Sequence, residues 1–237
     1  MRLRIRFNKL GKIRFTSHRD VARIWERALR RSGLPVAYSE GFNPRPKISF
    51  GLALSTSHES EAEYLDLDLD ADRVGSIDPA QLPGILSGAL PDGLTVTAAT
   101  EIGRREPSLQ HSVTSCTWRI DASGVDAETA ARAVARALAA EQIIVTRERK
   151  GKQVTDDVRP MILGIDVDGP TDDGVRLTAE LGTQPRALRP AELLAAIDPA
   201  LTERRVLRLH QWTVNDDGAR REPVSQAPLS AAALGEQ

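Results

Sequence analysis

The sequence predicts an α+β protein made of two tandem ferredoxin-like domains, each with the element order βαββαβ and an antiparallel sheet. Three observations support this prediction. Short stretches with period-two alternation of apolar residues, typical of half-buried strands, recur along the chain. Stretches with the spacing of amphipathic helices lie between them. The element order of the first half recurs in the second, and 237 residues are enough for two domains with separate cores.

The first half contains the elements of one such domain. Leu3, Ile5 and Phe7 alternate with arginines, which predicts a strand. A helix is expected over residues 18–31, because Ser17 and Asp20 have capping-box spacing and an apolar stripe follows. Extended segments at 34–39, 48–54 and 63–70, a helix at 79–90 and a strand at 94–102 complete the order.

The second half repeats this order without visible sequence identity to the first. Strands are expected at 113–121, 142–147, 161–168, 175–181 and 205–212, and helices at 126–140 and 190–197. We therefore predict domains over residues 1–103 and 111–214, joined by a linker at 104–110. Residues 215–237 are polar and Ala-rich, which predicts a disordered tail.

Composition predicts a cytoplasmic protein. No stretch reaches the roughly 20 apolar residues that span a bilayer, and the N-terminus lacks a signal-peptide core. Cys116 is the only cysteine, which excludes an intrachain disulfide and a multi-cysteine metal site. Because Cys116 alternates with apolar residues, we expect it in the core. The sequence predicts no cofactor and no membrane partner.

The net charge of −1 hides a strong asymmetry along the chain. Residues 1–50 contain thirteen Lys and Arg against three acidic residues, and residues 51–100 contain nine acidic residues against Arg73. Such a division indicates either a basic binding face or two strips that neutralise each other.

Two groups of arginines in this basic segment have different interpretations. The first group lies on one face of the first strand, where it can bind phosphate or pair with acidic residues of a neighbouring strand, the alternative we favour. The second recurs every four residues along the first helix and has little acidic company, so it is the better candidate for binding RNA or an acidic protein. The first group is Arg2, Arg4 and Arg6, facing Asp66, Asp68 and Asp70; the second is Arg19, Arg23, Arg27 and Arg31.

Two loops are further binding candidates. The Gly- and Pro-rich loop 41–51 contains Asn43, Arg45 and Lys47, which can converge on a ligand, although a rigid connection is the alternative. Phe42 and Phe50 of this loop can stack on bases, but we predict that both are core residues. The second loop carries Arg149, Lys150 and Lys152, followed by Arg159; it suits a phosphate or an acidic partner, and a solvated hairpin tip is the alternative.

The catalytic candidates are His18, Asp20 and His58. The two histidines can form an acid–base pair, and Asp20 can act as a nucleophile. Tight ligand spacing is absent, so we predict no metal site. A hydrogen-bonded structural role in the first helical turn explains His18 equally well.

Several motifs resemble a bacterial family known as the radical-SAM-associated, or radical-SAM-linked, proteins. They include Phe-Thr-Ser-His-Arg-Asp at 15–20, Ala-Leu-Arg-Arg-Ser-Gly-Leu-Pro at 28–35, Tyr-Ser-Glu-Gly-Phe-Asn-Pro-Arg-Pro-Lys-Ile-Ser-Phe-Gly at 38–51 and Glu-Ser-Glu-Ala-Glu-Tyr at 59–64. Further matches are Arg-Lys-Gly-Lys at 149–152, Asp-Val-Arg-Pro at 157–160 and Arg-Pro-Ala-Glu at 189–192. The resemblance spans about residues 1–209. The family often has His where this chain has Arg45, and Leu where it has Arg19.

The resemblance implies a partner rather than a reaction. In many bacteria a domain of this family is fused behind a cobalamin-binding radical-SAM enzyme, and family membership implies no established activity. One cysteine is too few to hold an iron–sulfur cluster, so any linked redox chemistry must lie in another polypeptide.

Three hypotheses of function follow. The preferred one is a non-catalytic adaptor that presents RNA, or an RNA-bearing partner, to a separate radical-SAM enzyme. The second is an RNA-modifying or RNA-processing enzyme that uses His18, His58 and Asp20. The third is a purely protein-binding subunit whose basic helix docks on an acidic partner.

Overall fold

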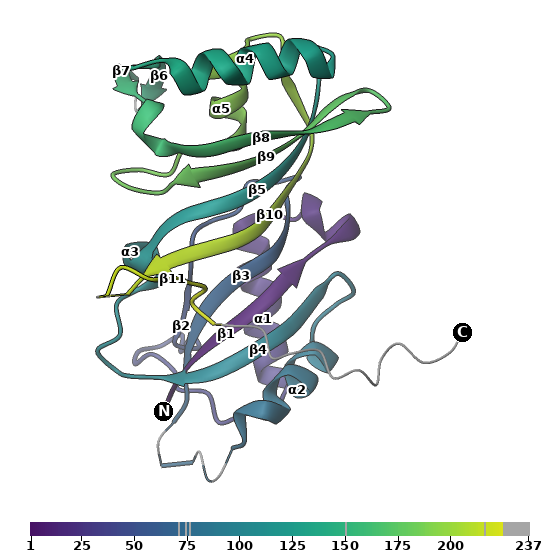
Figure 1. Ribbon diagram of the computed structural model, residues 1–237. Coiled ribbons are helices and arrows are strands. Elements are labelled where there is room, and N and C mark those ends of the chain that lie inside the picture. Colours follow the sequence, from purple (N-terminus) through teal and green to yellow (C-terminus); the bar gives the residue numbers. More distant parts are fainter. Residues whose placement is uncertain (71, 74, 76, 150, 216, 225–237) are drawn as a thin grey trace. The chain divides into compact units, whose positions relative to one another are not determined.

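The computed structural model describes residues 1–237 except 71, 74, 76, 150, 216 and 225–237 (Figure 1). The chain divides into two compact units. The first contains Met1–Ser112 and the described residues between Asn215 and Val224, and the second contains Val113–Val214. Both units are α+β with antiparallel strand pairing, which confirms the α+β class and the antiparallel sheets of the prediction. Among the described residues, no helix has the length and apolar character needed to cross a bilayer.

In the first unit, two helices pack on one face of a sheet with the strand order β4-β1-β3-β2 (Figure 1). The predicted segment 34–39 contributes only isolated bridges, one of them between Val36 and Leu69. The elements are β1 (Arg2–Lys9), η1 (Gly11–Phe15), α1 (His18–Arg31), β2 (Ile48–Phe50), β3 (Glu59–Asp68), η2 (Pro79–Gln81), α2 (Leu82–Ala89), β4 (Leu94–Ile102), α3 (Leu109–Ser112) and β11 (Arg220–Arg221).

The core of the first unit lies between this sheet and its two helices. Leu3, Ile5 and Phe7 of β1 are buried there, as the alternation of β1 predicts. Trp25 of α1 is fully buried and meets Phe7 edge-on, with 5.0 Å between the ring centroids. The contact fixes which face of α1 is turned toward the sheet.

The arginines of β1 occupy the opposite face of the sheet and pair with β3. Arg4 is buried and makes a bidentate contact with Asp66, with Nε–Oδ1 and Nη2–Oδ2 distances of 2.8 and 3.1 Å. Arg2 approaches the same carboxylate within 3.0 Å and Asp68 within 3.7 Å. The expected neutralisation of the two strands is therefore confirmed for these residues, because antiparallel pairing sets Arg4 opposite Asp66.

Arg6 continues the row of arginines with different partners. Its Nε donates to the Tyr64 hydroxyl at 3.1 Å, and its Nη2 lies 3.2 Å from a carboxylate oxygen of Glu222. Burial raises the pKa of Tyr64. Asp70 was expected to face the arginines of β1, but β3 ends at Asp68 and the register sets Tyr64 opposite Arg6.

Two segments expected to be peripheral belong to the first unit. Leu109 and Val224 are buried in a second apolar cluster with Tyr64, and Pro107 accepts a hydrogen bond from Arg4. The expected linker 104–110 is thus partly packed. The prediction of a disordered tail is wrong for the described part of residues 215–224, because Glu222 forms a partly buried ion pair with Arg6 and Val224 packs in an apolar cluster.

The second unit contains a sheet with the strand order β10-β5-β9-β8 and a separate β6–β7 hairpin (Figure 1). Cys116 is buried in this unit, as expected. The elements are β5 (Val113–Ser123), α4 (Ala127–Ala139), β6 (Ile144–Arg149), β7 (Lys152–Asp157), η3 (Arg159–Met161), β8 (Ile162–Thr171), β9 (Gly174–Gly182), α5 (Pro190–Ile197) and β10 (Thr202–Val214).

The hairpin is the main departure from the predicted order. The strand expected at 142–147 pairs with β7, which was not predicted, and does not join the main sheet. Its polar sequence lacks a continuous apolar face, so alternation alone does not reveal β7.

Replacing Asp66 with Asn should destabilise the protein by about 3 kcal/mol, because the buried guanidinium of Arg4 would lose its carboxylate. The free energy of unfolding in urea measures the effect. Glu128→Gln is the control, since the exposed pair of Glu128 with Arg132 should contribute about 0.5 kcal/mol or less. Equal effects of the two changes would contradict a structural role for the buried pair.

Candidate functional site

Helix α1 presents a polar face because its apolar face is held on the sheet. Ser17 caps its N-terminus, where the serine Oγ accepts from the Asp20 backbone at 3.2 Å and donates to the Asp20 carboxylate at 2.7 Å. Gly33 follows the helix with a φ of 71°, a conformation that glycine adopts without strain. The buried positions are Val21, Trp25, Ala28 and Leu29, and the positions on the opposite side are Arg19, Arg23, Glu26 and Arg30.

The loop between α1 and β2 is pinned at its base. The backbone of Ser39 donates to the Arg45 carbonyl at 2.8 Å, and the Arg45 backbone donates to the Ser39 hydroxyl at 3.1 Å. An isolated bridge joins Tyr38 to the buried Pro46. These contacts close residues 39–45 into a short loop whose base has a defined position.

The polar face of α1 and this loop border a groove of about 470 Å³, here called the arginine groove. Among the described residues that line it, four are arginines and Glu26 alone is acidic. Arg23 pairs with Asp20 at 3.1 Å, whereas Arg19, Arg30 and Arg45 make no ion pair through their guanidiniums within the described residues. The groove therefore carries excess positive charge. It is lined by Arg19, Ala22, Arg23, Glu26, Arg30, Asn43, Pro44 and Arg45.

The arginines of α1 that line the groove differ from those of the predicted stripe. Arg19 and Arg23 line the groove, but Arg27 does not, and Arg31 donates to the Ala89 carbonyl at 2.6 Å. A spacing of four residues drifts by about 40° per step around a helix, so the stripe turns away from one face. Arg30 was not predicted, although the spacing 19, 23, 26 and 30 follows one helix face closely.

The other predicted residues of loop 41–51 have different surroundings. Asn43 and Arg45 border the groove, whereas Lys47 lines a separate hollow with Arg2, Asp66 and Asp68. The prediction that Phe42 is a core residue is wrong. Phe42 lies at the tip of the loop with a relative exposure of 106%.

The three catalytic candidates make contacts within the fold or are buried in it. The ring of His18 meets that of Phe50 edge-on, with centroids 5.4 Å apart, and Phe50 is partly buried against the apolar core. Asp20 belongs to the cap of α1 and pairs with Arg23. His58 is buried immediately before β3.

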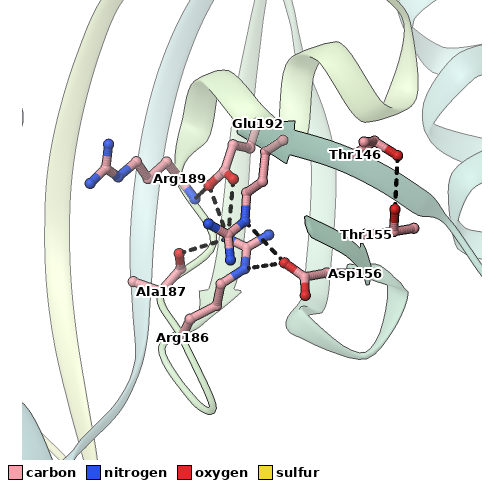
Figure 2. A network of polar contacts seen from close by, with 8 residues as sticks. Thr146, Thr155, Asp156, Arg186, Ala187, Arg189 and Glu192 are labelled. Carbon is pink, nitrogen blue, oxygen red and sulfur yellow. Dashed lines mark hydrogen bonds and ion pairs between the residues drawn. The ribbon is translucent and has the colours of Figure 1, made fainter. Parts of the chain in front are cut away.

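The second predicted basic patch lies at the β6–β7 hairpin. Two arginines close to it, Arg147 and Arg186, form ion pairs within the protein. Figure 2 shows Arg186 between Asp156 and Glu192, at 3.0 and 3.1 Å. Arg147 also contacts Asp156 at 3.0 Å, and the hydrogen bonds from Arg147 and Arg186 lower the pKa of Asp156. Lys152 is exposed at the start of β7; Lys150 and the side chain of Arg149 lie outside what the structure describes.

Arg159 has a structural role in place of the predicted binding role. Its guanidinium donates to the carbonyls of Leu138 and Ala140, at 2.9 and 3.2 Å, and to that of Ile162 at 3.0 Å. The first two carbonyls lie at the C-terminus of α4, where unpaired acceptors need partners. Arg159 therefore ties this helix end to β8.

Across the described part of the chain, no group of three or more His, Cys, Asp or Glu side chains is placed to hold a metal ion. The arginine groove is thus the site with the most distinct chemistry. Guanidiniums in such a groove bind phosphates or carboxylates, frequently through two parallel hydrogen bonds.

Comparison with known protein families places the groove inside a shared region. The chain belongs to DUF2344, a family of uncharacterized proteins conserved in bacteria. The family model matches residues 2–190, which include every residue of the arginine groove. No curated protein matches the chain.

Among solved structures, the chain is similar to one in the crystal structure of a Cbf5-Nop10-Gar1 complex, with a TM-score of 0.52 and 10% sequence identity. The similarity covers 88% of this chain and 48% of that one, so the present chain spans about half the length of its structural neighbour. At this identity the similarity concerns the fold alone.

The cap of α1 should make stability depend on pH through Asp20. The Ser17 hydrogen bond, assisted by Arg23 and Arg19, lowers the pKa of Asp20 below its usual 3.8. The ionised carboxylate therefore stabilises the folded state above pH 3.8, and this contribution is lost as the pH falls through the lowered folded pKa.

Asp20→Asn should consequently melt at a lower temperature than the parent protein at pH 7, with a gap that narrows below pH 3.8. Thermal unfolding followed by circular dichroism measures both values. Asp92→Asn, at an exposed position, is the control. A gap that persists unchanged in acid would show that the carboxylate charge is not responsible.

Proposed function

We propose that this protein is a non-catalytic RNA-binding adaptor that works with a separate radical-SAM enzyme and binds RNA phosphates in the arginine groove. One observation carries the proposal. Arg19, Arg30 and Arg45 border a single groove, and their guanidiniums form no internal ion pairs within the described residues.

The dimensions of the groove suit an extended polyanion. Arg19 and Arg30 are separated by eleven residues of one helix, roughly 16 Å along its axis. Arg45 approaches from the loop on the other side. A ligand with several regularly spaced phosphates can contact all three, and release of counterions from that ligand favours binding.

The assignment as an adaptor rests on the roles of the catalytic candidates. Asp20 is engaged by Ser17 and Arg23, and His18 packs against Phe50. In this proposal Asp20 and His18 stabilise α1 and its packing, and the groove binds the ligand.

The radical-SAM partner is inferred from the sequence resemblance. The motifs at residues 15–20 and 38–51 resemble proteins linked to radical-SAM enzymes, and both contribute residues to the groove. Because the chain has a single cysteine, the iron–sulfur cluster of such a pathway would belong to the partner.

We also propose that both units are ferredoxin-like. When the four main strands of each unit are numbered in chain order, both sheets run fourth, first, third, second. In this interpretation the β6–β7 hairpin is an insertion after the first helix of the second unit. Fold alone implies no activity, so the function depends on the groove.

Reversing the groove charges tests RNA binding directly. The triple variant Arg19→Glu, Arg30→Glu and Arg45→Glu should weaken binding of a fluorescent RNA by at least about 100-fold, because each lost phosphate contact removes a charge-assisted interaction. The slope of log K against log salt should become shallower by about 0.7 per lost contact. Fluorescence anisotropy at several salt concentrations measures both.

The matched control is Arg104→Glu, Arg105→Glu and Arg136→Glu, which changes the net charge equally at exposed positions outside the groove. It should retain most of the affinity. Equal RNA affinity of the groove variant and the parent protein would refute the proposed site. Stronger binding of the parent protein to polyglutamate than to RNA would favour an acidic protein partner.

The partnership predicts that a radical-SAM enzyme co-purifies with this protein from native cells. If RNA bridges the two, nuclease treatment or the triple groove variant should release the enzyme. Affinity capture followed by mass spectrometry detects the partner. Absence of any radical-SAM protein from crosslinked samples would contradict the partnership and leave RNA binding to be judged by anisotropy.

A further inference from the structure

Phe42 is the most exposed large apolar side chain of the described residues. Aromatic residues make up only 4% of the sequence, and phenylalanine occurs four times. Burial of a phenylalanine ring contributes about 1.5–3 kcal/mol to folding. A ring exposed at a loop tip forgoes this contribution and is available for contact with a ligand.

The loop places the backbone of Phe42 next to the arginine groove. Phe42 directly precedes Asn43, which lines the groove, so their Cα atoms are about 3.8 Å apart. Gly41 has a φ of 119° and allows the sharp path of the chain before the ring. The contacts between Ser39 and Arg45 close the loop at its base. Phe42 is therefore an exposed aromatic residue whose backbone adjoins the lining of a basic groove.

We infer that the ligand of the arginine groove is single-stranded RNA, with a base stacked on Phe42 while the arginines hold the phosphates. This inference rests on the proposed function and names the form of RNA. Single strands expose the faces of their bases, and aromatic side chains bind these faces without strong sequence preference. Asn43, the next residue, lines the groove, and its amide can donate to or accept from a base edge.

Other polyanions use only part of this arrangement. In a duplex the base faces are stacked on one another, so a protruding ring finds no partner except at an end. An acidic peptide satisfies the guanidiniums but has no planar bases for the ring. Single-stranded RNA is distinguished from both because it can use the arginines that have no ion pair within the described residues together with the exposed aromatic ring.

Phe42→Ala separates stacking from phosphate binding. It should weaken binding of oligoadenylate about tenfold, which corresponds to a stacking contact of about 1.4 kcal/mol. It should leave competition by inorganic polyphosphate unchanged, because the arginines remain. The parent protein should bind oligoadenylate more tightly than duplex RNA of equal length. Because the ring is fully exposed, the melting temperature should not fall.

Phe42→Trp provides a spectroscopic signature. It should retain the affinity for oligoadenylate, and its indole fluorescence should be quenched by oligoadenylate but not by polyphosphate, because only a base can stack on the ring. Phe15→Leu, at another exposed phenylalanine outside the groove lining, is the control and should change affinity less than about twofold.

The outcomes distinguish the two proposals. If the groove triple variant loses RNA but Phe42→Ala binds oligoadenylate like the parent protein, the inference of stacking is wrong and RNA binding stands. Tighter binding of duplex RNA than of oligoadenylate would also overturn the inference. If the triple variant binds RNA like the parent protein, the proposed function itself fails.

Discussion

The site depends on the burial of one face of α1. Trp25 packs on Phe7 in the core of the first unit, with Val21 and Leu29 on the same side of the helix. Once that face is fixed, a period of 3.6 residues directs Arg19, Arg23 and Arg30 to the opposite side. The groove then needs only the loop that follows α1, which contributes Arg45 from across it. Apolar packing thus determines where the positive charge is displayed.

The arginines of this protein divide into those that stabilise the fold and those available to a ligand. Arg4 and Arg6 are buried against Asp66 and Glu222. Arg159 ties down the end of α4, and Arg186 joins Asp156 to Glu192. A basic residue in the sequence is therefore a weak indication of binding by itself. The guanidiniums of the groove differ because no carboxylate of the described residues pairs with Arg19, Arg30 or Arg45.

The comparisons establish a family without an assigned activity and a fold shared at low identity with part of a larger chain. The proposed function therefore rests on the chemistry of the site. The arginine groove supplies the charge, and Phe42, which precedes the groove residue Asn43 in the sequence, supplies an exposed apolar surface. These two features have independent physical origins, since one concerns unneutralised charge and the other an aromatic ring kept out of the core.

The sequence alone determined the periodic elements: the strand around Ile5, the capped helix after Ser17 and the pairing of Arg4 with Asp66 follow from local spacing and from strand adjacency. The tertiary structure decided which exposed groups share a surface. Arg30 faces the groove because α1 is rotated by its core contacts, and Arg159 is occupied because carbonyls of α4 and β8 approach it. Phe42 is exposed at the tip of a loop whose base is closed by the contact between Ser39 and Arg45. Such placements depend on contacts between residues distant in sequence, and the local periodicity of a sequence does not reveal these contacts.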